Sequence, residues 1–162
     1  KNLLENLIII LLIILLLNFK GILYLGDSGS YTIGLFTGIF LIDFAFNNNS
    51  ISPYFIIVLL WYPCFELLFS IIRRFFKKLK TYSPDTTHLH HLVYKKIKTY
   101  FKIKNNSISH FTSTLIINFY NLMTFYISLK YIYSSAVLIT IFFINIFVYI
   151  VSYNYLKKII QN

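Results

Sequence analysis

Charged residues are scarce in this 162-residue chain. They make up 12% of it, whereas roughly 25% is typical of a soluble globular domain. Hydrophobic residues make up 57%, a content that excludes a disordered tail. The single cysteine, Cys64, excludes a disulfide framework and a cysteine-based zinc site. Together these features favour a membrane protein over a water-soluble one.

Several apolar runs approach the length that a bilayer requires. A hydrocarbon core about 30 Å thick needs about 20 mostly apolar residues per helix. The runs cover residues 3–17, 31–46, 54–72 and 111–155, and the last breaks best around residues 130–135. The sequence therefore predicts an all-α fold, a polytopic membrane helix bundle with about five transmembrane segments. We expect residues 1–162 to form a single membrane domain.

The basic residues indicate the orientation of these segments. Ten of the 15 Lys and Arg residues lie between positions 73 and 104. Because basic loops stay on the cytoplasmic side, residues 73–110 are predicted to form a cytoplasmic loop. Alternation of the spans then makes the turn at residues 20–30 cytoplasmic, and the loops at 47–53 and 130–135 external. A basic loop beside a membrane helix more often contacts anionic lipid than nucleic acid, so we expect no nucleic-acid partner.

One candidate site is the run Gly26-Asp27-Ser28-Gly29-Ser30, at the start of the second span. Glycines allow a ligand to approach the backbone closely, and N–H groups at a helix start hold phosphate oxygens. An aspartate here suits a magnesium ion that also binds substrate phosphates. A tight turn in which Asp27 or Ser28 caps the next helix explains the same residues equally well.

The other candidate site is a histidine-rich segment at residues 83–92. Asp85 is predicted to be the N-cap of a helix that runs to about Phe101. One side of that helix is apolar, and the other is polar. The apolar side carries Leu89, Leu92, Val93, Ile97, Tyr100 and Phe101. The polar side carries His88, His91, Lys95, Lys98 and Lys102, with His90 at the margin.

Such an amphipathic helix can lie in the membrane interface and show its basic face to an anion. Three histidines and several lysines suit a phosphate better than a metal ion. The alternative is a basic interfacial helix whose histidines are merely solvated. Glu66 lies inside the third predicted span. A charged side chain is costly to insert into a bilayer, so Glu66 should face other helices or water. A hydrogen-bonded helix contact and a role at the site both remain open for Glu66.

The two motifs in this order resemble those of a membrane enzyme family. Asn18 followed by residues 25–31 and Gly34 resembles the aspartate loop of the polyprenyl-phosphate N-acetylhexosamine-1-phosphate transferases. This family includes the phospho-MurNAc-pentapeptide translocase. Residues 62–74, with Pro63 and Glu66, look like one bacterial branch of it, and residues 84–95 are similar to its histidine loop. The likeness covers roughly residues 18–98.

The resemblance implies a reaction at the cytoplasmic face of a bacterial plasma membrane. A sugar-1-phosphate, expected to be N-acetylhexosamine-1-phosphate, moves from a UDP-sugar to polyprenyl phosphate, usually undecaprenyl phosphate. UMP leaves, and cell-surface polysaccharide synthesis begins. By family likeness Asp27 holds Mg²⁺, which Mn²⁺ can replace. The catalytic residues would be Asp27, His88, His90 and His91, and the substrate-binding residues Asn18, Ser28, Gly29, Ser30 and Asp85.

The family's paired-aspartate loop is absent from this sequence. We therefore expect the chain to be the C-terminal part of a larger enzyme and inactive alone. The competing hypothesis is a non-catalytic multi-span membrane subunit whose basic interfacial helix binds lipid or a partner. No oligomeric state follows from the sequence.

Overall fold

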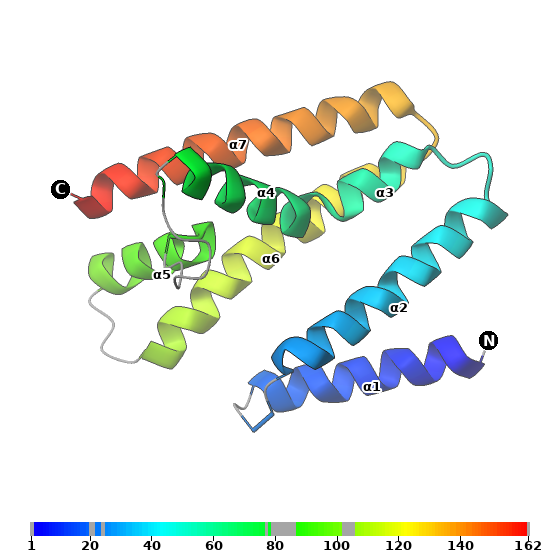
Figure 1. Ribbon diagram of the computed structural model, residues 1–162, viewed down its shortest axis with the longest axis horizontal. Coiled ribbons are helices and arrows are strands. Elements are labelled where there is room, and N and C mark those ends of the chain that lie inside the picture. The colour runs from blue at the N-terminus through cyan, green and yellow to red at the C-terminus, as the bar shows by residue number, and fades with distance from the viewer. Residues whose placement is uncertain are drawn as a thin grey trace. The chain divides into compact units, whose positions relative to one another are not determined.

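The computed structural model describes residues 2–19, 22–23, 25–76, 78, 87–101 and 106–161. These residues contain helices and no strand, which confirms the all-α prediction. In chain order the helices are α1 (Asn2–Phe19), α2 (Gly26–Asn47), α3 (Pro53–Leu59), α4 (Trp61–Phe76), α5 (Leu89–Tyr100), α6 (Asn106–Lys130) and α7 (Ser135–Gln161) (Figure 1).

The helices belong to two compact units, residues 1–48 and residues 49–162. The prediction of a single membrane domain stays a prediction.

Fewer helices qualify as membrane spans than the sequence predicted. Among the described residues, α2 and α7 are each long and apolar enough to cross a bilayer, and α3 and α4 together make a third if they form one broken span. In α1 the qualifying apolar stretch is shorter, at Ile8–Asn18. Helix α6 has 25 residues and is long enough to span, but Ser, Thr and Asn recur along it and make it less apolar than the spans that qualify. Two or three helices of the described residues thus meet this requirement by length and composition, and the expected number of about five stays a prediction.

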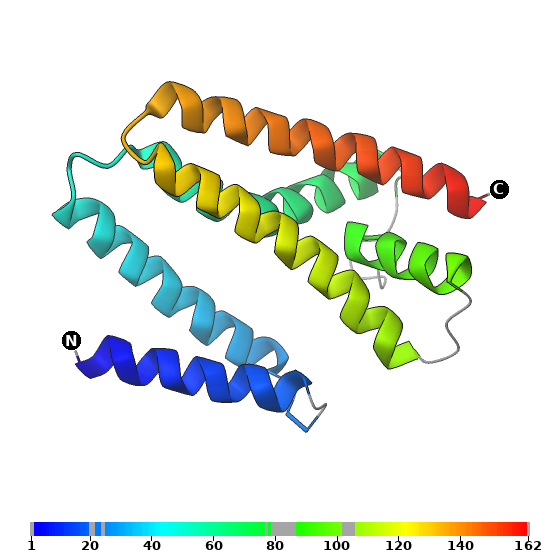
Figure 2. The ribbon, with the colours of Figure 1, turned by 180° about the vertical axis from the view of Figure 1, so that it is seen from behind.

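The first unit is a helical hairpin. Helices α1 and α2 run in roughly opposite directions: they lie close together where α1 ends and α2 begins, and they diverge away from there in both views (Figures 1 and 2). An apolar cavity of about 400 Å³ lies along them, and its lining includes Asn18, Leu25 and Ile33. No residue of α2 is buried. Because large apolar side chains such as Leu35 and Ile42 point outward, this unit matches a membrane protein rather than a soluble one.

The predicted third span is broken into two helices at Leu60. Helix α3 ends at Leu59, α4 begins at Trp61, and the two axes differ by 66°. Pro63 explains the position of the break. Proline lacks the N–H that would bond to the carbonyl four residues earlier, at Leu59, and its ring clashes with that carbonyl. The backbone bonds resume at Cys64, whose N–H donates to the Leu60 carbonyl at 3.3 Å.

At one end of the second unit, two loops predicted to be external meet. The Ser52 N–H donates to the Ile132 carbonyl at 3.0 Å, and the hydroxyls of Ser52 and Ser135 lie 2.9 Å apart. At the other end, α5 packs against α6 and the C-terminal half of α7 (Figure 2). Within this unit, the described parts of the predicted cytoplasmic loop and the predicted external loops therefore lie at opposite ends.

The interior of the second unit joins an aromatic cluster to a polar helix interface. Residues at the centre of the cluster are Trp61, Leu89, Leu92, Tyr149, Tyr153 and Leu156. Ser109, Ser113, Thr124, Ser128 and Asn145 are also buried, and the Tyr120 hydroxyl donates to Asn145 Oδ1 at 2.6 Å. Small and polar residues between helices, with apolar residues outside, are typical of packing in membranes.

Candidate functional site

The histidine helix α5 begins later than the sequence predicted. Its first residue is Leu89, and His88 occupies the N-cap position with an extended backbone (φ −65°, ψ 153°). Asp85 is therefore not the N-cap, and its own position lies outside the described residues. Of the residues on the predicted apolar side, Leu89, Leu92 and Ile97 are buried. Tyr100 and Phe101, on the same predicted side, are 76% and 63% exposed.

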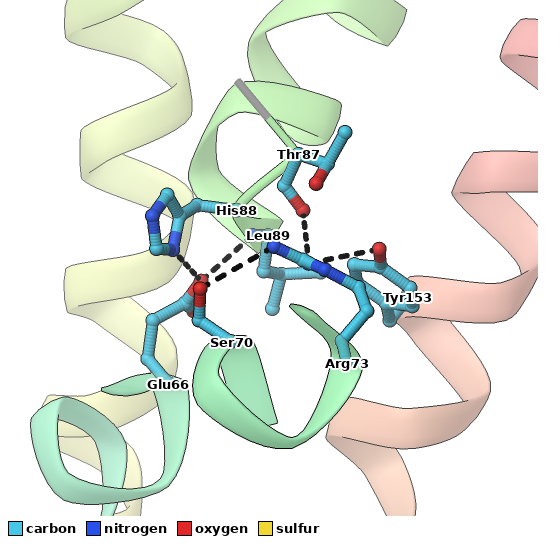
Figure 3. A network of polar contacts seen from close by, with 7 residues as sticks. All are labelled: Glu66, Ser70, Arg73, Thr87, His88, Leu89 and Tyr153. Atoms are coloured by element: carbon cyan, nitrogen blue, oxygen red, sulfur yellow. Dashed lines mark hydrogen bonds and ion pairs between the residues drawn. The ribbon is translucent and has the colours of Figure 1, made fainter. Parts of the chain in front are cut away.

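Glu66 of α4 caps α5 from outside the helix. One carboxylate oxygen, Oε1, accepts the backbone N–H of Leu89 at 3.0 Å and lies 3.0 Å from Nδ1 of His88 (Figure 3). A carboxylate at a helix N-terminus is stabilised by the free N–H groups and the helix dipole. The structure thus shows the hydrogen-bonded helix contact, and a role of Glu66 at the site stays a prediction.

Arg73, one turn beyond Ser70 on α4, holds the residue before His88. Its guanidinium donates to the Thr87 carbonyl at 2.8 Å and to the Tyr153 hydroxyl of α7 at 2.9 Å (Figure 3). A longer bond of 3.4 Å reaches the Ser70 hydroxyl. Glu66 and Arg73 are seven residues apart, so they lie on the same face of α4. That face therefore fixes the chain on both sides of His88.

We expect Arg73→Ala to destabilise the full-length protein by about 2 kcal/mol, since hydrogen bonds to a charged group contribute roughly 1.5–3 kcal/mol. Packing of the arginine over the Phe69 and Tyr153 rings is lost as well. The measurement is the free energy of unfolding in detergent, with Lys158→Ala as the control at the exposed end of α7. Equal stability of Arg73→Ala and the control variant would contradict the role given to Arg73.

The three histidine rings gather at the start of α5. The ring centroids of His90 and His91 are 4.3 Å apart. The rings of His88 and His90 are nearly parallel, and their centroids are 5.5 Å apart. Partial burial, then the neighbouring His91, lowers the pKa of His90, and Glu66 opposes this shift in part. A histidine with a lowered pKa is mostly neutral at pH 7. His90 therefore offers a ligand one donor and one acceptor rather than a positive charge.

His110 of α6 also lies near the histidine cluster, which no sequence motif predicts. Its ring stacks on Tyr94 of α5 with a centroid distance of 4.0 Å and an interplanar angle of 12°. The charge of His110 also contributes to lowering the pKa of His90. No motif surrounds His110, and it reaches the cluster because α6 packs along α5. Local spacing carries no signal of such a contact.

The aspartate motif lies at the start of α2 in the first unit. Gly26 has φ +63°, a left-handed conformation that favours glycine, and its carbonyl accepts the Ser30 hydroxyl at 2.8 Å. Leu25 occupies the N-cap position, while Asp27 and Ser28 lie inside the helix. The alternative that Asp27 or Ser28 caps α2 is therefore wrong. Asp27, Ser28 and Ser30 are exposed, as is Asn18 at the cavity along α1, and Gly29 is half-buried.

At Gly29 the side chain of Leu25 leaves little room. A Cβ added at position 29 would lie 2.8 Å from Cγ of Leu25. Packing against Leu25 therefore explains this glycine without reference to a ligand.

Asp27 alone does not make a complete metal site. Among the described residues no three His, Cys, Asp or Glu side chains are grouped as metal ligands. Magnesium, however, binds through one or two carboxylates together with substrate phosphates and water. A single exposed carboxylate fits that pattern. Asp27 and the three histidines belong to different units, so their predicted meeting at one site stays a prediction.

Comparison with known proteins finds two curated relatives. The chain is 32% identical over 74 residues to an undecaprenyl-phosphate alpha-N-acetylglucosaminyl 1-phosphate transferase of Thermotoga maritima, a match covering 46% of this chain and 24% of the relative. It is 33% identical over 72 residues to a protein of the same name from Yersinia pestis, covering 43% of this chain and 20% of that relative. No family model and no solved structure matches the chain.

The matches thus span a quarter or less of each relative. They agree with the expectation that this chain corresponds to part of a longer protein. The chain is an all-α membrane protein, and its predicted resemblance to the polyprenyl-phosphate N-acetylhexosamine-1-phosphate transferases is confirmed by two curated relatives of that kind.

Proposed function

We propose that the chain carries the histidine half of the active site of a polyprenyl-phosphate sugar-1-phosphate transferase. The observation that supports this most is the cluster of three histidine rings at the N-terminus of α5, held by Glu66 and Arg73 of α4. Three histidines followed by several lysines on the same helix suit an anionic ligand. The diphosphate of a UDP-sugar, expected to be UDP-N-acetylglucosamine, is such a ligand.

In this proposal each motif has its own task. His88, His90 and His91 bind the diphosphate or the sugar through ring N–H groups, while Asn18, Ser28, Gly29, Ser30 and Asp85 complete the substrate site. Asp27 would hold magnesium, which, when bound, neutralises the charge that develops on the transferring phosphoryl group. The lipid phosphate attacks the β-phosphorus of the UDP-sugar, and UMP leaves.

The site is proposed to face the cytoplasm at the inner leaflet of the bacterial plasma membrane. Basic residues of α5 and of the C-terminal end of α7 support this side, since positive charge is retained in the cytoplasm. Asp27 and His88 are separated in sequence by the second and third predicted spans, and two crossings return the chain to the same side. A lipid substrate needs a site in the membrane, and a nucleotide substrate needs the cytoplasmic face.

The test replaces His88, His90 and His91 together with glutamine in the full-length protein. We expect UMP release from UDP-N-acetylglucosamine, with undecaprenyl phosphate and magnesium present, to fall about tenfold to 100-fold, because hydrogen bonds from the rings to the diphosphate or the sugar are lost while side-chain size is roughly kept. A matched control replaces Lys95, Lys96 and Lys98 of the same helix with glutamine. Full activity in the histidine variant would remove the three rings from the mechanism.

A non-catalytic role as a lipid-binding subunit remains the second candidate because of a groove beside α5. It has a volume of about 520 Å³, and its lining combines Lys95, Lys96 and Lys98 with Ile159 and Ile160 of α7. In such a groove the lysine ammonium groups would bind the phosphate of an anionic phospholipid, and the isoleucine side chains would contact its acyl chains. In this case the lysine variant loses binding to phosphatidylglycerol vesicles, and the histidine variant works normally.

A further inference from the structure

We propose that His110 of α6 is a fourth histidine of the candidate site and binds the same anionic diphosphate as His90 of α5. The inference rests on the proposed function for the identity of the substrate, while the anion site itself rests on the contacts of the described residues. His110 lies outside both sequence motifs, so only the packing of α6 against α5 reveals the relation.

The ring of His110 is placed by Tyr94, which belongs to the histidine-bearing face of α5. Tyr94 follows His90 by four positions and His91 by three, so the three side chains share one face of the helix. Its ring is stacked on that of His110, with centroids 4.0 Å apart and 12° between the planes. The Tyr94 hydroxyl donates to Oδ1 of Asn106, at the start of α6, at 3.4 Å. His110 therefore continues the histidine face of α5 onto α6.

His110 also acts on His90 electrostatically. Partial burial and the neighbouring His91 are the main causes of the lowered pKa of His90, and His110 adds to them. Two imidazoles close enough to repel each other when charged are both attracted by an anion placed beside them. A diphosphate bound by both rings would therefore offset the repulsion between them.

Positive charge predominates around these rings. Nζ of Lys98 lies 5.8 Å from the centre of the Tyr94 ring. Glu66 is the only acid in the described part of the second unit, and its Oε1 is bonded at the start of α5, to the Leu89 N–H. A surface that offers ring N–H groups and an ammonium group suits a phosphate, because charge-assisted hydrogen bonds are the strong ones.

His110 is able to donate a hydrogen bond to such a ligand. Its side chain is exposed, and neither ring nitrogen is bonded to another described residue. A neutral imidazole has one N–H, and either nitrogen can carry it when both are unbonded. Stacking on Tyr94 uses the face of the ring and leaves both nitrogens at its edge. An N–H of His110 can therefore point toward a phosphate oxygen.

The direct test is ¹⁵N magnetic resonance of the full-length protein with labelled histidine, in lipid and without UDP-sugar. The signals of His110 are assigned by their loss in His110→Phe and in His110→Gln, and those of His90 by their loss in His90→Gln. Pyrophosphate, added without magnesium so that Asp27 is not involved, should shift the signals of both rings. Sodium chloride at the same ionic strength should leave them unchanged. Unshifted His110 signals would overturn the proposal, whether or not those of His90 move.

Kinetics separates binding from packing. Phenylalanine at position 110 keeps a ring that can stack on Tyr94 but has no N–H. We expect KM for UDP-N-acetylglucosamine to rise about tenfold in His110→Phe with a smaller change in kcat, since a contact to the bound substrate is lost. Tyr126→Phe, at an exposed ring near the other end of α6, is the matched control and should keep the wild-type KM.

A wild-type KM in His110→Phe would show that His110 only packs against Tyr94, and the proposal would then be wrong while the transferase stands. The opposite result is equally distinct. Protein in which pyrophosphate shifts the His110 signals but which releases no UMP would support the anion site and refute the transferase.

Discussion

Replacing Asp27 with asparagine in the full-length protein is expected to lower magnesium-dependent UMP release about 10²- to 10³-fold. Removal of one group that stabilises charge in a transition state typically costs this much. Asparagine keeps the size of the side chain and one oxygen, but it loses the negative charge that binds a divalent cation. The measurement is kcat at saturating UDP-N-acetylglucosamine over a range of magnesium concentrations.

The structure indicates that this substitution leaves the fold intact. Asp27 is exposed in the first turn of α2 and does not cap that helix. Loss of a carboxylate there removes about 0.3–1 kcal/mol of favourable interaction with the helix dipole. Asp43→Asn is the matched control, since Asp43 lies on the same helix near its other end and accepts the Asn47 amide at 3.0 Å. Unchanged turnover in Asp27→Asn would exclude Asp27 from the mechanism.

Truncation of Trp61 to alanine is expected to reduce the free energy of unfolding by about 3–5 kcal/mol, the range for large aromatic residues in a packed core. Trp61 is 4% exposed and lies edge-on to the rings of Tyr62 and Tyr120, with centroid distances of 5.6 and 6.1 Å. It also belongs to the cluster that holds Leu89 and Leu92 of α5. Its loss should therefore loosen the support of the histidine helix.

Unfolding of the full-length protein in detergent measures the effect of Trp61→Ala. Trp61→Phe keeps most of the aromatic packing and should cost clearly less than the alanine variant. Leu122→Ala is the second control, because Leu122 is 63% exposed on α6 and its truncation should change stability by less than about 0.5 kcal/mol. If Trp61→Ala and Leu122→Ala were equally stable, the cluster would not be the core of the second unit.

Much of the local structure followed from the sequence. Apolar runs and their breaks predicted helices at the positions of α1, α2, α6 and α7, and the side chain of Pro63 explains the break between α3 and α4. The 3.6-residue pattern placed Leu89, Leu92 and Ile97 on the apolar side of α5, and all three are buried. Tyr100 and Phe101 of the same side are exposed, since periodicity identifies a face but does not say where the neighbouring helices end.

The start of α5 shows a different limit. Asp85 has the chemistry of an N-cap, and that chemistry is the reason for predicting it as the cap. The helix instead begins at Leu89, where Glu66 accepts the first N–H. A capping group that comes from another helix leaves no trace in local spacing.

By itself, the sequence determined that this is an all-α membrane protein with an aspartate motif and a histidine motif, because composition, helical periodicity and short motifs are local properties of the chain. Tertiary structure alone decided which groups surround His88. Glu66 lies 22 positions from His88 in the sequence. The Arg73 guanidinium donates to both Thr87 and Tyr153, and Tyr153 lies 80 positions from that arginine. Such partners meet only after α4, α5 and α7 have packed, since burial selects contacts by distance in space rather than along the chain.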